Sequence, residues 1–270
     1  MVPVSTLIAC VITLLVTLVL PVVVLVVFAT MHKKQGIVSA WLLGAAGFFV
    51  TQILIRVPIL TLLQSQSWFL EFANSHLFGY AFTLAFTAGL FELAGRFGVA
   101  KLLQKKLTWN RTLAAGLGHG GIEAMVLIGM TYVNNLAYIA MINSGTFDAT
   151  LAQAAAAGVD VAQLELVKQQ LVTMSPAMFL LAGFERILAM TGHAAMSALV
   201  CYGVAHKKVL PCTLLCLLIH TFIDLTAGIT LVLPQTTAYI LVYAILILVA
   251  VFSLYVLKDL RRRWTAPKGE

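Results

Sequence analysis

The chain has 270 residues, of which 61% are hydrophobic and only 10% are charged, and its mean hydropathy is +1.00. A soluble domain of this length carries about a quarter charged residues, so the composition excludes a water-soluble globular protein. The formal net charge is +7, but the basic residues lie between apolar segments, which indicates membrane topology and contact with anionic lipids. We therefore expect an all-α, multi-pass membrane protein without a nucleic-acid partner.

Seven segments are long and apolar enough to cross a bilayer, which takes about 20 residues in a helix. In chain order they cover residues 4–30, 37–63, 76–96, 112–142, 176–205, 209–232 and 236–257. The Ala- and Gln-rich loop at 143–175 predicts an interfacial helix or a cap on the outer side. We expect one transmembrane domain spanning residues 1–270, with a catalytic-like core at about 76–232 and peripheral helices at 4–63 and 236–257.

The distribution of Lys and Arg predicts the orientation of the bundle. Fourteen of the seventeen basic residues follow the first, third, fifth or seventh segment. Lys168 lies in an opposite-side loop, whereas Arg56 and Arg186 fall inside predicted spans. Because cytoplasmic loops are enriched in Lys and Arg, we expect an outside N-terminus, a cytoplasmic C-terminus and a location in the plasma membrane.

Ionisable side chains recur inside four of the predicted spans, where each costs about 2.5–3.5 kcal/mol on insertion scales. They occur in groups at helical spacing: Glu92 with Arg96, His119 with Glu123, Glu185 and Arg186 with His193, and His220 with Asp224. Residues four apart lie on one face of a helix. Such residues usually face the protein interior and carry function.

These groups lie at a similar depth in the membrane. Counted at 1.5 Å per residue from the nearest basic residue on the cytoplasmic side, Glu92, Glu123, His193 and His220 lie roughly 13–21 Å inside that edge. Each has a structural explanation when taken alone, as a buried ion pair or a hydrogen-bonded core histidine. Independent packing contacts need not agree in depth, so the shared layer predicts one interior site. The glycines around His119, at 116, 118, 120 and 121, favour close helix packing there.

The residue types in this layer suit water activation. Two imidazoles and a carboxylate, with an open position for water, fit a catalytic zinc ion, which lowers the pKa of bound water to about 7. A further carboxylate can accept the proton, and Asp224 can fix the tautomer of His220. The spacing does not require a metal, because carboxylates and histidines also activate water without one. The same layer fits a proton-coupled transporter or a non-catalytic membrane scaffold.

Four motifs on these spans resemble, in chain order, those of the YhfC-type intramembrane metalloproteases, which belong with the CAAX-protease and bacteriocin-processing (CPBP) superfamily and the PrsW-type proteases. The stretches that match are Phe91-Glu92-Leu93-Ala94-Gly95-Arg96, Gly118-His119-Gly120-Gly121-Ile122-Glu123-Ala124, Phe184-Glu185-Arg186 with Gly192-His193-Ala194-Ala195, and His220-Thr221-Phe222-Ile223-Asp224. The family's first motif has a glutamate pair where this chain has Glu92 alone. The catalytic base is therefore either Glu92 or Glu123.

The resemblance implies hydrolysis of a peptide bond in the membrane. From the shared depth of the polar groups we expect the site about halfway across, open toward the cytoplasmic half. The resemblance also implies His193 and His220 as metal ligands or transition-state stabilisers, and with one carboxylate the predicted zinc ligands are Glu123, His193 and His220. The predicted catalytic residues are Glu92, Arg96, His119, Glu123, Arg186 and Asp224. The implied partners are membrane lipids and a membrane-embedded or lipidated peptide or protein substrate.

Overall fold

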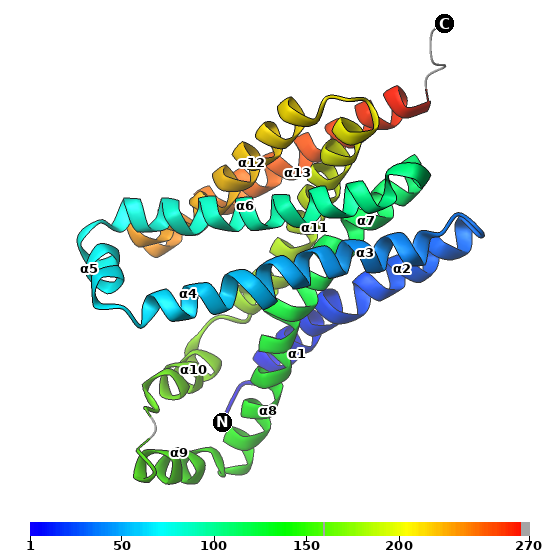
Figure 1. Ribbon diagram of the computed structural model, residues 1–270. Coiled ribbons are helices and arrows are strands. Elements are labelled where there is room, and N and C mark those ends of the chain that lie inside the picture. The colour runs from blue at the N-terminus through cyan, green and yellow to red at the C-terminus, as the bar shows by residue number, and fades with distance from the viewer. Residues whose placement is uncertain (159, 266–270) are drawn as a thin grey trace, which may run out of the picture. The chain divides into compact units, whose positions relative to one another are not determined.

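The computed structural model describes residues 1–158 and 160–265, and the regular elements in this part of the chain are all helical (Figure 1). Seven helical stretches within it are long and apolar enough to cross a membrane: Val4–Met31, Ile37–Gln64, Leu77–Lys106, Trp109–Ser144, Pro176–Ala205, Val209–Thr230 and Gln235–Trp264. The all-α class and the seven predicted spans are confirmed. The third and seventh helices run several residues further than predicted, because a helix continues into its polar flank where the apolar pattern stops. The orientation of the termini stays a prediction.

The chain forms two compact units. The first comprises Met1–Val22 and Ala124–Ile187, and the second comprises Val23–Glu123 and Leu188–Glu270. Three of the apolar stretches pass from one unit into the other. The expected single transmembrane domain covers both units and stays a prediction.

In the first unit the elements, with η denoting short 3-10 or π-helical turns, are α1 (Val4–Leu14), η1 (Leu15–Val19), the start of α2 (Leu20–Met31), η4 (Ala124–Gly129), α8 (Met130–Ser144), α9 (Phe147–Ala156), α10 (Ala162–Thr173) and the first part of α11 (Pro176–Ala205). The hydroxyls of Thr13 and Tyr132 both donate to the carbonyl oxygen of Phe179, at 2.8 and 2.9 Å. The loop predicted to be helical forms α9 and α10, whose Phe147 and Leu171 are buried in the apolar core of this unit.

In the second unit the elements are the end of α2, α3 (Ile37–Phe48), η2 (Phe49–Arg56), α4 (Val57–Gln64), α5 (Ser67–Ser75), α6 (Leu77–Leu103), η3 (Gln104–Lys106), α7 (Trp109–Glu123), the end of α11, α12 (Val209–Leu225), η5 (Thr226–Leu231) and α13 (Gln235–Thr265). Helix α6 contacts α3 and η2 on one side and α12 on another (Figure 1). A side chain in the middle of α6 can therefore reach residues from both neighbours.

Helices α3 and α7 pack backbone against backbone. A Cβ atom added at Gly118 would lie 2.0 Å from the carbonyl oxygen of Trp41, and one at Gly44 would lie 1.9 Å from that of Ala115. Both distances are far below any ordinary carbon–oxygen contact, so only glycine fits at these two crossings. Small residues at a helix interface permit this approach in membranes.

The same helix approaches α11 along another face. A Cβ atom at Gly116 would lie 2.7 Å from the Cα of Ala194, and one at Gly120 would lie 3.0 Å from the Cβ of His193. The glycines that flank His119 thus bring α7 against two neighbours at once. His119 is 1% exposed as a result.

Candidate metal centre

The carboxylate of Glu92, on α6, is the point where four segments of the second unit meet. Its Oε2 lies 2.9 Å from Arg96 Nη2, 3.0 Å from His119 Nε2 and 2.8 Å from His220 Nε2. Its Oε1 accepts a hydrogen bond of 2.7 Å from Gln52 Nε2. Each carboxylate oxygen offers about two acceptor sites, so the three partners of Oε2 leave no site free on that atom, whereas Oε1 accepts one hydrogen bond. Its side chain is buried and serves as a charged anchor for the surrounding helices.

Arg96 links Glu92 to His193 and selects the tautomer of that histidine. Its Nη2 lies 2.6 Å from His193 Nδ1. A guanidinium group can only donate, so Nδ1 accepts and a neutral His193 carries its proton on Nε2. That Nε2 lies 2.7 Å from Glu123 Oε2. The ring is therefore fixed at both nitrogens, between a donor and a carboxylate.

His220 lies between two carboxylates. Its Nε2 faces Glu92, and its Nδ1 lies 3.3 Å from Asp224 Oδ2 without the alignment of a hydrogen bond. An imidazole can donate from both nitrogens only in its protonated form. This position suits a group that stabilises negative charge, and it agrees with Asp224 acting on the ring of His220. The metal-ligand role assigned to His220 has less support from this geometry and stays a prediction.

Four buried residues form a group whose geometry fits a metal ion. One ligand atom from each of Glu92, His119, Glu123 and His193 lies within 4.8 Å of the others. Ligands of tetrahedral zinc at 2.0–2.1 Å are about 3.3 Å apart, so small movements of side chains would complete such a site. Imidazole and carboxylate donors suit zinc among the biological metals.

The guanidinium of Arg96 lies between two members of this group, Glu92 and His193. The same Nη2 of Arg96 that lies 2.6 Å from His193 Nδ1 lies 2.9 Å from Glu92 Oε2, so lone pairs of both residues face one cation. Histidines that bind metals usually donate their second N–H to a carboxylate or carbonyl. His193 meets this condition when Nδ1 is the ligand and Nε2 faces Glu123. The residues of this group therefore fit a metal ion, which would take the place of the Arg96 guanidinium between Glu92 and His193.

The residues predicted from the sequence are divided between the two compact units. Arg186 lies in the first unit, where it forms an ion pair with Glu185, and its predicted catalytic role stays a prediction. The other predicted residues are either in the cluster or, like Asp224, in contact with a member of it. Their catalytic and ligand roles stay predictions.

The sequence analysis did not predict a role for Gln52 and Arg56, which lie on η2 in a span described as peripheral. Gln52 is 5% exposed and donates to Glu92, and its Oε1 lies 3.4 Å from Arg56 Nη1. The two are polar residues four apart on one face inside a span, which is the same signal as in the other groups. A π-helical turn such as η2 inside a longer helix is often found at functional sites.

Fold and site together define a multi-pass helical membrane protein with a buried Glu/His cluster that could bind a metal ion. Residues 16–256 match the family model described as YhfC intramembrane metalloprotease, and the chain belongs to that family. It is similar to "Uncharacterized membrane protein YhfC" of Bacillus subtilis (strain 168), with 30% identity over 198 residues, or 73% of this chain and 74% of that protein. No solved structure matches the chain. Membership in the wider CPBP and PrsW groups stays a prediction.

Proposed function

We propose that the protein is a metallopeptidase that hydrolyses a peptide bond within or beside the plasma membrane. The observation that carries this proposal is the convergence of Glu92, His119, Glu123 and His193 in the interior of membrane-spanning helices. Ionisable residues at such positions are costly and mark function. The family description supports the same reaction class. Bound zinc would supply a polarised water molecule that is reactive near neutral pH.

Glu123 is the general base in this proposal. Oε2 of Glu92 already faces Arg96, His119 and His220, so a proton on this atom would displace one of these contacts. Glu123 would accept the proton of the attacking water and return it to the leaving amine, as catalytic carboxylates do. His193, 2.7 Å from Glu123, holds this carboxylate in place. His220 would stabilise the negative charge that develops on the carbonyl oxygen.

Cleavage of a quenched peptide library by purified protein tests the proposal. Glu123→Gln, His193→Ala and His220→Ala are each expected to lower cleavage at least about 100-fold, the usual contribution of a general base or oxyanion donor. Glu71→Gln, an exposed carboxylate on α5, is the matched control and should cleave normally. Cleavage by all three variants at the wild-type rate would overturn the assignment.

One feature favours a second function, a proton-coupled transporter. Asp224, His220 and Glu92 are three titratable groups that lie in series, at 3.3 and 2.8 Å, and such a series can carry protons. Metal content separates the two functions. Stoichiometric zinc that is lost in His193→Ala supports the peptidase, whereas a metal-free protein that drives substrate flux into proteoliposomes supports the transporter.

A further inference from the structure

A cavity of about 360 Å³ lies beside the candidate metal centre, with walls from η2, α6, α12 and η5. Arg56 and Asp224 both line it. Each also contacts the cluster, Asp224 through His220 and Arg56 through Gln52. The residues of α6 that line the cavity precede Glu92 in the sequence. Under the predicted topology this places the cavity in the outer half of the membrane, whereas the sequence predicted a site open toward the cytoplasmic half.

The guanidinium of Arg56 has donors to spare. It donates to the carbonyl oxygen of Leu84 at 2.6 Å, to Thr87 Oγ1 at 3.3 Å and to Gln52 Oε1 at 3.4 Å. Arginine has five N–H groups, so two are left for another acceptor. None of the ion pairs found among residues 1–158 and 160–265 includes Arg56, although it lies in a membrane span, where a cation favours a partner.

Asp224 supplies an acceptor to the same cavity. Its contact with His220 uses Oδ2, and its side chain is 34% exposed, unlike the buried members of the cluster. The cavity thus has a donor group on η2 and an acceptor group on α12. A peptide group needs this combination, because it has one carbonyl acceptor and one N–H donor.

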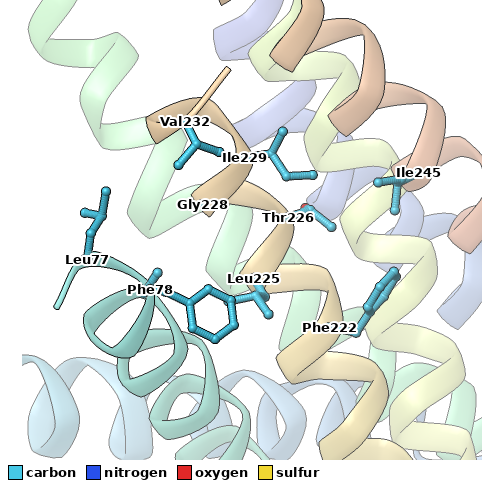
Figure 2. A pocket seen from close by; sticks show the side chains of 10 residues that line it. Leu77, Phe78, Phe222, Leu225, Thr226, Gly228, Ile229, Val232 and Ile245 are labelled. Carbon is cyan, nitrogen blue, oxygen red and sulfur yellow. The ribbon is translucent and has the colours of Figure 1, made fainter. Parts of the chain in front are cut away.

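An apolar cavity of about 480 Å³ adjoins this one, and the two share Ala81 and Gly228 in their walls. Figure 2 shows its lining side chains from α6, such as Phe78, and from α12 and η5, such as Leu225 and Ile229. Polar atoms are scarce among them. The surface next to Arg56 and Asp224 therefore suits apolar side chains.

We infer that the two cavities together hold an extended, apolar peptide segment, with its main chain at Arg56 and Asp224 and its side chains in the apolar cavity. A membrane segment that is extended for cleavage leaves main-chain groups unpaired, and each costs several kcal/mol in lipid. An acyl chain would use only the apolar cavity, and an anionic headgroup would use only Arg56. The choice of a peptide as the occupant rests on the proposed function.

Binding of two synthetic peptides tests the inference. The first is a fluorescent 20-residue Leu/Ala peptide with a central Gly-Pro pair, and the second carries N-methyl groups on the amides beside that pair. Both are titrated against Glu123→Gln protein in phosphatidylcholine nanodiscs, so that binding is measured without cleavage. We expect the unmodified peptide to bind about 10-fold more tightly, the ratio for one hydrogen bond to a charged acceptor. Asp224→Ala should abolish this preference, and Arg56→Met should weaken both peptides about 10-fold or more.

Matched variants control for loss of charge and for misfolding. Lys101→Met and Asp259→Ala remove the same charges at positions outside both cavities and should bind like the Glu123→Gln background. If Arg56→Met does not fold, Arg56→Lys is measured in its place, and it should weaken the binding of both peptides several-fold.

Equal binding of the two peptides by the background, or unchanged binding by the Arg56 and Asp224 variants, would overturn the inference. Displacement of the peptide by phosphatidylglycerol but not by unlabelled peptide would also overturn it. Binding with these preferences in a protein that cleaves nothing would refute the proposed function and leave the inference standing. If the wild-type protein cleaves peptides but the binding assay shows none of these preferences, the inference is wrong and the proposed function stands.

Discussion

The replacement of Gly118 by alanine tests the packing on which the candidate metal centre depends. The new methyl group would lie 2.0 Å from the carbonyl oxygen of Trp41. An ordinary contact between these atoms is 3.4 Å or more, so α3 and α7 must separate by about 1.4 Å. Because the neighbouring residue is His119, the shift would also move its ring relative to Glu92.

The expected free-energy change combines two opposing effects. Overpacking a close-packed interior typically costs about 1–3 kcal/mol, and a displaced backbone belongs at the upper end. Alanine in place of glycine within a helix stabilises the folded state by about 1 kcal/mol, because alanine has the higher helix propensity. The net loss in the free energy of unfolding is therefore about 2 kcal/mol.

Gly98→Ala is the matched control, because a Cβ atom at this position of α6 would have no neighbour within 4 Å. It should be neutral or stabilise the protein by up to about 1 kcal/mol. Reversible unfolding in mixed micelles, followed by far-UV circular dichroism, measures both variants. If Gly118→Ala is as stable as Gly98→Ala, the proposed backbone contact between α3 and α7 is wrong.

Three further outcomes are expected. Arg96→Met removes the donor that holds Glu92 and His193, so it should cost about 3–5 kcal/mol in the same unfolding assay, and wild-type stability would contradict the central role of this ion pair. Tyr132→Phe should cost about 1 kcal/mol through the lost hydrogen bond to Phe179, with no measurable change if that contact is absent in solution. Treatment with 1,10-phenanthroline should lower peptide cleavage at least about 100-fold and zinc should restore it, whereas resistant activity would exclude a metal from the reaction.

Sequence periodicity and hydropathy were sufficient to place the spans. Seven apolar stretches separated by polar loops leave few alternatives, because an apolar stretch of about 20 residues pairs all its backbone groups in lipid by forming an α-helix. The shared depth of Glu92, Glu123, His193 and His220 similarly followed from counting residues along regular helices, whose rise per residue is constant. Depth along each helix is a one-dimensional property that the sequence contains.

The contacts of Gln52 required the tertiary structure. Its position faces Glu92 because η2 is π-helical and packs against α6, and neither the turn geometry nor the partner helix is encoded in hydropathy.

The amino-acid sequence by itself determined the all-helical class, the seven spans and the residues with the chemistry to activate water. Only the tertiary structure decided which nitrogen of each histidine faces Glu92, which carboxylate has its acceptor sites occupied, and which polar residues from a supposedly peripheral helix join the cluster. The physical reason is that rotation about the helix axis and the choice of neighbouring helix depend on packing between distant segments, here on glycines that let two backbones touch.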